Sequence, residues 1–292
     1  MKLTSHRTSR RLRPRGLVAV GLAVASVAVL AACAPASTDG VVSAPSGSSS
    51  AAPDSGTTLA DVQKAGKLVI GTEGTYKPFS FHADGSGQLT GYDIDVVTAV
   101  AEKLGVTPEF QETQWDAIFA GLDAGRFDLI ANQVSINPER QAKYDFSTPY
   151  TVSHGVVIVP ASNTDITSLA SLSGKTTAQS QSSNWYQTAK DAGATVQVVD
   201  GWAQSIALLE QGRIDATVND ELTFLDYQKT DPSAAAAVKV GATTDDVSES
   251  AFTAVKGSDS LIKAIDQALA ELKADGTLAS ISDKYFGSDV SE

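Results

Sequence analysis

An internal repeat constrains the fold of this chain more than any other feature of its sequence. The segment 115–133 reads WDAIFAGLDAGRFDLIANQ, and the segment 202–220 reads WAQSIALLEQGRIDATVND. Tryptophan, leucine, glycine, arginine, aspartate and asparagine recur at a constant offset of 87 residues. Each copy predicts a helix, a glycine with positive φ at which the helix stops, and a strand. Two units of one design predict two α/β lobes, each with a strand edge that can face a ligand.

Polar residues close both copies of the repeat. Asn132 and Gln133 follow the apolar run FDLIA, and Asn219 and Asp220 stand at the same place in the second copy. In open α/β sheets the carboxyl ends of the strands form the ligand site, so these residues are candidates to line a cleft between the lobes. Asp220 could instead cap the helix expected over 221–228, and both roles can hold together.

Arg140 occupies an unusual place for a cation. Asn137 predicts a helix N-cap and Pro138 the first helical residue, so Arg140 falls in the first turn. The partial positive charge of a helix N-terminus disfavours a cation there unless an anion lies beside it. An anionic ligand would provide that anion; the alternative is a structural ion pair with Glu139, Asp145 or another surface carboxylate.

Two further loops offer polar groups at strand ends. The strand KLVIG (67–71) leads into a Gly/Pro loop that presents the carboxylate of Glu73 and the rings of Tyr76 and Phe79. The loop 180–184, which includes Ser183 and Asn184, precedes a helix expected from Trp185. Free N–H groups at such a helix start favour a carboxylate.

The rest of the chain predicts how the lobes are connected. A strand over 152–160 would cross into the second lobe, and a strand over 248–256 would return. A helix over 96–104 carries an apolar stripe, and helices over 260–274 and 278–285 would rejoin the first lobe.

The N-terminus predicts export. Six basic residues precede the apolar run 17–32, which is too short for a confident membrane span, so residues 1–32 are typical of a signal peptide. Cys33 is the only cysteine and cannot form an internal disulfide. The sequence LAAC resembles the lipobox of bacterial lipoproteins, in which the cysteine is lipidated and becomes the mature N-terminus; the alternative is a buried free thiol. Residues 34–58 have the composition of a flexible linker.

Charge and residue usage argue against several function classes. Without the six basic residues of the signal, 16 Lys and Arg remain against 34 Asp and Glu, which gives a net charge of −18. Nucleic-acid binding needs a basic face, so we expect no nucleic-acid partner. The three histidines, His6, His82 and His154, are too scattered to predict a metal site, and no Ser-His-Asp or Cys-His group can be assembled.

Several motifs together give the chain a family resemblance. These are IGTEGTYKPFSF, LTGYDIDV, GLDAGRFDLIANQVSINPERQAKYDFSTPY, GRIDATVND and ADGTLASISDKYFG. From Leu59 to Gly287 the chain resembles the solute-binding proteins of ABC importers for polar amino acids. The versions ANQVSINPER and TTAQSQSSNW are most similar to the cystine-binding branch.

The resemblance implies a type II periplasmic-binding-protein fold of two α/β lobes joined by two crossover strands. Lobe 1 would comprise residues 59–153 and 249–292, and lobe 2 residues 154–248. It implies a polar amino acid ligand, cystine favoured, with no cofactor. It also implies an ABC permease and ATPase as partners, a monomer, and a location on the outer face of the cell membrane with only the lipid anchor in the bilayer.

Site residues carried over from the family divide by the part of the ligand they would contact. Arg140, with N–H groups at Ser135 and in the loop of Ser183 and Asn184, would bind the carboxylate. Asp220 would take the ammonium, helped by a main-chain acceptor near Gln133, while Asn132 and Gln133 would bear on ligand choice. Tyr76, Phe79 and Trp115 would contact the ligand side chain, with Glu73 near its polar end.

Two other functions remain open on the same fold. One is a dehydratase-like enzyme, for which Glu73 or Asp220 would be a general acid. The other is a sensor that signals through a partner protein. An enzyme converts its ligand whereas a receptor returns it unchanged, and the genetic neighbourhood separates an importer from a sensor.

Overall fold

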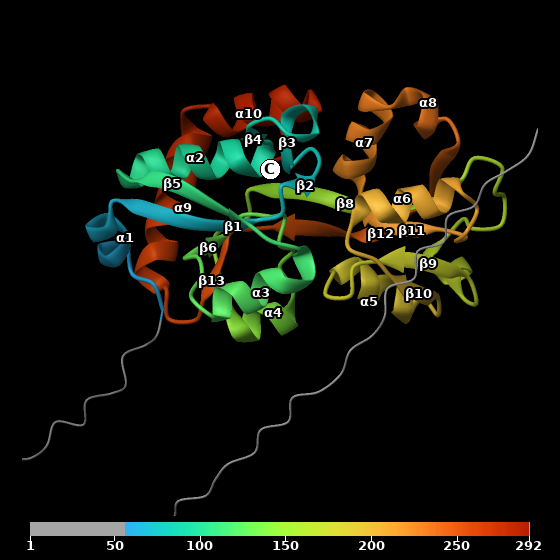
Figure 1. Ribbon diagram of the computed structural model, residues 1–292, viewed down its shortest axis with the longest axis horizontal. Helices are drawn as coiled ribbons and strands as arrows, with labels where there is room; N and C mark the ends of the chain where they lie inside the picture. Colours follow the sequence, from blue (N-terminus) through green and yellow to red (C-terminus); the bar gives the residue numbers. More distant parts are fainter. Residues whose placement is uncertain (1–55, 292) are drawn as a thin grey trace, which may run out of the picture. The chain divides into compact units, whose positions relative to one another are not determined.

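A computed structural model of the chain describes residues 56–291. The strands of this part form two groups, and each group lies at the centre of one lobe (Figure 1). The expected signal peptide, Cys33 and nearly all of the expected linker lie outside these residues. None of the helices in the described part combines the length and the apolar character that a bilayer span needs.

The first lobe is organised around a five-stranded sheet of order β5-β1-β6-β13-β7. Its strands are β1 (Lys67–Thr72), β5 (Thr107–Glu112), β6 (Leu129–Ile130), β7 (Tyr144–Phe146) and β13 (Thr253–Val255). β1 runs parallel to both β5 and β6, whereas β13 runs antiparallel to β6 and β7. Because β1 and β6 end at the same edge, the loops that follow them lie together.

Helices and a small sheet complete the first lobe. They are α1 (Leu59–Ala65), α2 (Tyr92–Leu104), α3 (Trp115–Asp123), α4 (Pro138–Lys143), α9 (Asp259–Ala274), α10 (Thr277–Phe286), the short strands β2 (Thr75–Tyr76), β3 (Ser80–His82) and β4 (Leu89–Thr90), and the 3-10 turn η1 (Ala83–Gly85). The apolar stripe of α2 is buried as predicted. The helix begins four residues earlier than expected, at Tyr92.

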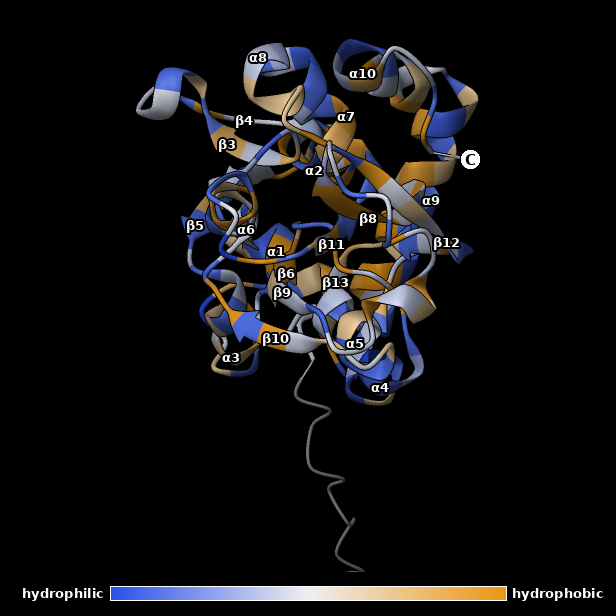
Figure 2. Cartoon of the chain, turned by 90° about the vertical axis from the view of Figure 1, so that its right-hand side faces the viewer, coloured by the Kyte–Doolittle hydropathy of each residue, from blue (hydrophilic) through white to orange (hydrophobic). Residues whose placement is uncertain are grey.

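The second lobe contains an antiparallel sheet of order β11-β8-β12 and a parallel pair, β10-β9. Its elements are β8 (Thr151–Pro160), η2 (Leu169–Leu172), β9 (Thr176–Gln179), α5 (Asn184–Asp191), β10 (Thr195–Val198), α6 (Trp202–Glu210), β11 (Thr217–Asp220), α7 (Glu221–Thr230), α8 (Pro232–Ala235) and β12 (Val238–Ser250). Figure 2 shows hydrophobic residues on central strands such as β8, whereas the residues of α4 are mostly hydrophilic.

The two connections between the lobes form one long antiparallel pair. β8 pairs with β12 from Thr151 opposite Ser250 to Pro160 opposite Val238. The expected return strand over 248–256 is divided between the end of β12 and β13. β12 pairs with β8, whereas β13 joins the sheet of the first lobe. The predicted two-lobed α/β fold with two crossover strands is therefore confirmed.

The two copies of the internal repeat end their helices in the same way, but the strands that follow belong to different sheets. Gly125 follows α3 and Gly212 follows α6, and both have a φ of 66°. The predicted positive φ of both glycines is confirmed. An L side chain is strained in this conformation, which explains why glycine occupies both positions. The strands that follow differ, since β6 runs parallel to β1 and β11 runs antiparallel to β8.

Candidate functional site

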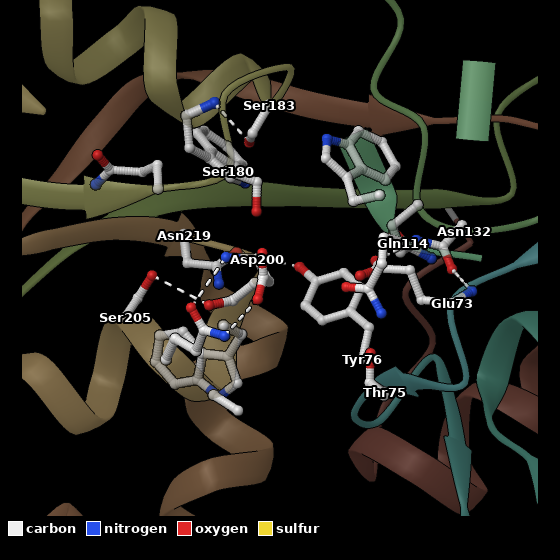
Figure 3. Close-up of a pocket in the computed structure, with 18 of the residues that line it drawn as sticks. Glu73, Thr75, Tyr76, Gln114, Asn132, Ser180, Ser183, Asp200, Ser205 and Asn219 are labelled. Carbon is white, nitrogen blue, oxygen red and sulfur yellow. Dashed lines mark hydrogen bonds between the residues drawn. The ribbon is translucent and has the colours of Figure 1, made fainter. Parts of the chain in front are cut away.

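A cavity of about 310 Å³ is lined by residues of both lobes (Figure 3). Seven of the residues predicted for the site line it: Glu73, Tyr76, Trp115, Asn132, Gln133, Ser183 and Asn184. A cavity of this size, with a few polar groups converging on it, is typical of a small-molecule site. No group of His, Cys, Asp and Glu suited to a metal ion occurs in residues 56–291.

Glu73 and Asn132 meet at the edge where β1 and β6 end. The Asn132 side chain donates to the Glu73 carboxylate at 2.7 Å, and its Oδ1 accepts the backbone N–H of Glu73 at 2.8 Å. Burial raises the pKa of Glu73 to about 7, although the bond from Asn132 opposes the rise. A cation beside Glu73 would favour its charged form.

Gln133 is held by a buried carboxylate behind the cavity. Its φ is 50°, and its N–H and Nε2 donate to the two oxygens of Asp93 at 2.9 and 2.6 Å. Burial raises the pKa of Asp93 to about 7. Since Nε2 also donates to Thr151, the unpartnered side-chain atom of Gln133 within residues 56–291 is Oε1, an acceptor.

Aromatic residues form part of the cavity wall and join the lobes. The hydroxyl of Tyr76 donates to Asn219 Oδ1 at 3.1 Å and accepts from Thr223 at 3.0 Å. Figure 3 shows Tyr76 and Asn219 reaching each other from opposite sides of the cavity. The Nε1 of Trp115 has no partner among the described residues, although Trp115 is buried.

The prediction that Phe79 contacts the ligand is wrong. Phe79 is fully buried in the core of the first lobe, where its ring centroid lies 5.1 Å from that of Tyr76 and 5.9 Å from that of Phe286. The loop between β2 and β3 turns back after Tyr76, so Tyr76 lines the cavity and Phe79 does not.

Arg140 lies between the lobes. Asn137 caps α4 as predicted, with its side chain accepting from the backbone N–H of Arg140 at 2.9 Å. The guanidinium donates to the carbonyl of Ser135 at 2.9 Å and to that of Ser182, in the second lobe, at 3.0 Å. It also packs against the rings of Trp115 and Phe119.

Neither Glu139 nor Asp145, the two carboxylates named as alternative partners, forms an ion pair with Arg140. Glu139 pairs with Lys143 and Asp145 pairs with Lys256, each at 3.0 Å. Among the described residues Arg140 has no ion pair, and burial lowers its pKa to about 10. A buried guanidinium without a carboxylate is suited to an anionic group of a ligand.

Asp220 is a buried acid of the second lobe with two partners. Its Oδ1 accepts from the backbone N–H of Leu222 at 2.9 Å, which confirms the predicted N-cap of α7. Its Oδ2 accepts from Ser153 at 2.5 Å. Burial raises the pKa of Asp220 to about 6. An ammonium group beside it would stabilise its charged form.

Ser135, Arg140 and Asp220 border the cavity without lining it. Ser135 is nearly buried, bridges to Ser250, and accepts from Arg140 through its carbonyl. Asp220 directly follows Asn219, a residue of the wall. The structure thus brings the predicted charged residues to the boundary of the cavity, behind its first layer of side chains.

The prediction missed much of the second-lobe wall. The missed residues are Thr75 and Gln114 of the first lobe and, in the second, Gln179, Ser180, Trp185, Asp200, Gly201, Trp202, Ala203, Gln204, Ser205, Val218 and Asn219, of which Asn219 was recognised only as an edge residue. Most follow the carboxyl ends of the parallel strands β9 and β10. Recognising the segment TVQV as a strand would have located the residues around Asp200 by the same rule that found Asn132.

Hydrogen bonds across the cleft hold the lobes together. Asp116 of the first lobe accepts from the backbone N–H and the hydroxyl of Ser182 at 2.9 and 2.6 Å. The backbone N–H of Gln181 also donates to Asp116, at 3.3 Å. Together with the contacts of Arg140 and Tyr76, these bonds show that the two lobes are closed around the cavity.

Known proteins resemble this chain over most of its length. Residues 68–288 match the bacterial extracellular solute-binding proteins, family 3. The L-cystine-binding protein TcyA of Bacillus subtilis is 45% identical over 92% of this chain and 96% of its own length. The unliganded, open L-cystine solute receptor of Neisseria gonorrhoeae is 48% identical over 80% of this chain and 99% of its own, with a TM-score of 0.56.

A ligand-bound structure is more similar in shape despite lower sequence identity. An ancestral arginine-binding protein bound to arginine is 37% identical, covers 76% of this chain and 99% of its own, and has a TM-score of 0.71. The lower TM-score of the open Neisseria receptor agrees with the hydrogen bonds that close the lobes here. The family match, the sequence identities and the similarity of the folds agree with one another. The chain belongs to the bacterial extracellular solute-binding proteins of family 3.

Proposed function

We propose that this protein captures a polar L-amino acid, cystine foremost, between its two lobes and delivers it to the permease of an ABC importer. The observation that carries the proposal is a cavity between closed lobes with a buried cation and a buried acid at its boundary. Arg140 belongs to the first lobe and Asp220 to the second, so that only the closed form would satisfy both ends of a zwitterion.

The two charges have the chemistry that an amino acid head group requires. A planar guanidinium binds a carboxylate with two parallel hydrogen bonds, and Arg140 has no competing carboxylate in residues 56–291. The N–H groups of Ser135 and Asn184 would assist it. Asp220 would accept the ammonium group, together with an acceptor of Gln133. Charges desolvated in this way bind strongly only when each finds its partner.

Cystine is favoured by the walls of the cavity and by the relatives. Glu73, Tyr76, Trp115 and Asn132 supply a carboxylate, an amide and aromatic faces beyond the head group. An apolar side chain would offer no acceptor to Trp115 Nε1, which has no partner among the described residues, and no cation to the Glu73 carboxylate. A buried polar group left unpaired costs about 1–3 kcal/mol. The names of the Bacillus and Neisseria relatives refer to cystine.

The remaining parts of the proposal concern location and assembly. The signal-like residues 1–32 and the LAAC sequence support export and lipid anchoring through Cys33 on the outer face of the cell membrane. The folded part would act as a monomer that docks on the permease, with ATP hydrolysis by a separate subunit. A ligand that returns unchanged after incubation, measured by mass spectrometry, would distinguish this receptor from a dehydratase.

A thermal-shift screen of the twenty amino acids and L-cystine tests the proposal. A ligand present at 100 times its dissociation constant adds about 2.7 kcal/mol to the free energy of unfolding, which gives a clear shift. We expect a shift with polar amino acids and the largest with cystine. A protein whose melting temperature does not respond to any of them would contradict the proposal.

A further inference from the structure

Gly155 lies in the middle of the crossover strand β8, where glycine is an unusual residue. It is buried, and its φ does not fall in the positive range that favours glycine. Glycine inside a strand has no side chain to pack and weakens the strand, and it often marks a place where another group approaches the backbone closely. Backbone conformation therefore does not explain Gly155, and a close neighbour is expected.

The close neighbour is the indole of Trp185, from the first turn of α5. A Cβ atom added to Gly155 would lie 2.4 Å from Trp185 Cζ3 and 2.8 Å from its Cη2. It would also lie 2.8 Å from Cγ2 of Thr244, whose hydroxyl accepts the backbone N–H of Gly155 at 2.9 Å. The six-membered ring of Trp185 thus occupies the space that any other residue at this position would fill.

The same face of the sheet carries the acid of the second lobe. Gly155 lies opposite Asp220 of the neighbouring antiparallel strand β11. Residues directly opposite each other in such a pair place their side chains on one face, with Cβ atoms about 5 Å apart. Ser153 is two residues before Gly155 and therefore on this face, and it donates to Asp220 at 2.5 Å. The edge of the indole over Gly155 therefore lies beside the Asp220 carboxylate.

The indole also forms part of the cavity wall. Trp185 lines the cavity, whereas Asp220 lies behind the first layer of side chains. Trp185 packs against the cluster that contains Val157 and Val218, the next opposed pair along the same face. Because the ring already rests on the backbone of β8, it cannot retreat from a ligand. A group that reaches Asp220 from the cavity must therefore fit beside this ring.

We propose that Trp185, seated on Gly155, restricts the group bound at Asp220 to an unsubstituted ammonium. This inference rests on the proposed function, in which Asp220 accepts the α-ammonium group of an amino acid. A methyl group on that nitrogen would need volume that the indole fills, and a closely packed wall yields space only at a cost in free energy. Trp185 is then a specificity-determining residue that selects primary amino acids and excludes N-alkylated ones.

Titration with matched pairs of ligands tests this size limit. N,N′-dimethyl-L-cystine differs from L-cystine only by one methyl group on each nitrogen, and N-methyl-L-alanine differs from L-alanine in the same way. Calorimetry would measure both pairs on the wild type, Trp185→Leu and Gly155→Ala/Trp185→Leu. Trp202→Leu is the control, because Trp202 also lines the cavity but packs against the cluster of Val156, on the opposite face of the sheet.

The size limit predicts how each variant changes the preference for the unmethylated ligand. The wild type should bind it at least about tenfold more tightly than its methylated partner. Trp185→Leu should reduce this preference to about threefold or less, because it opens space beside Asp220. Adding Gly155→Ala should restore part of the preference, because the new methyl group fills some of that space. Trp202→Leu should leave the preference at its wild-type value.

The outcomes that overturn the size limit differ from those that overturn the proposed function. Equal affinities of the wild type for methylated and unmethylated ligands would overturn it, as would a preference that Trp185→Leu leaves unchanged or that Trp202→Leu lowers equally. Trp185→Phe removes less volume and should lower the preference by a smaller factor, which gives a second test where Trp185→Leu does not fold. A wild type that binds no amino acid would contradict the proposed function and, with it, this role of Trp185.

Discussion

Three buried acids should make the stability of the unliganded protein depend on pH. Burial raises the pKa of Glu73 and Asp93 to about 7 and that of Asp220 to about 6. In the unfolded chain these acids titrate near pH ~4. Between these values the folded state binds more protons than the unfolded state, so the free energy of unfolding falls as pH rises.

We therefore expect the unliganded protein to be less stable at pH 8 than at pH 5 in urea titrations. Each unit of pKa shift corresponds to about 1.4 kcal/mol. His82, whose pKa is raised by its bond to Glu112, acts in the same direction, so Glu73→Gln serves to isolate one acid. That variant should lose less stability between the two pH values. Equal stability of the wild type at both would contradict the assignment.

The charges at the boundary of the cavity should dominate affinity. We expect Arg140→Ala and Asp220→Ala each to weaken amino acid binding by about 2–5 kcal/mol, because each leaves a desolvated ligand charge unpaired. Calorimetric titration measures the loss. Arg126→Ala is a matched control, since Arg126 is exposed on the first lobe. Affinities of both site variants close to that of the wild type would exclude the two-charge clamp.

At the scale of elements, the first turn of α3 should control closure. Asp116 does not line the cavity, yet it accepts hydrogen bonds from Gln181 and Ser182 across the cleft. We expect Asp116→Ala to weaken ligand binding by about 1 kcal/mol, because the closed form loses these bonds. Small-angle scattering of the liganded variant should show a more open molecule.

A second variant on the same helix distinguishes closure from damage to α3. Asp123 accepts from Tyr144 within the first lobe, at 3.2 Å. Asp123→Ala should therefore leave the affinity unchanged, even where it reduces stability. If both variants lose the same affinity, the contact of Asp116 across the cleft has no special role.

Elements with local signals could be predicted from the sequence, whereas strand pairing could not. Asn137 and Asp220 cap helices through bonds to residues two or three positions away, and Gly125 and Gly212 end helices at positive φ. Such signals depend only on residues that are close together in the sequence. The antiparallel pairing of β11 with β8 depends on segments far apart in the chain, and the repeat alone gave no sign of it.

The same distinction explains which site residues were found. Glu73 and Asn132 follow strands with clear apolar runs, so the edge rule located them. Phe79 has the same local context as Tyr76, and only the packing of the folded core separates them. The start of α6 carries no capping signal, so no local pattern marked it as part of the cavity wall.

At the scale of the whole molecule, Cys33 should determine attachment to the membrane. We expect Cys33→Ala to abolish labelling by fatty acids and to leave an unprocessed or released precursor, because the thiol is the lipidation site that LAAC predicts. Metabolic labelling and cell fractionation measure this. A variant that is still labelled and retained like the wild type would contradict lipid anchoring.

The central claim is that the closed lobes select cystine among amino acids. Calorimetric titration of the purified protein with L-cystine, L-arginine and L-leucine tests it most directly. Arginine is the strongest competitor, because Glu73 alone could favour a cation. We expect cystine to bind more tightly than arginine or leucine, since it alone presents two head groups to the charged and amide residues of the cavity. Arginine or leucine binding about tenfold more tightly than cystine would contradict the account.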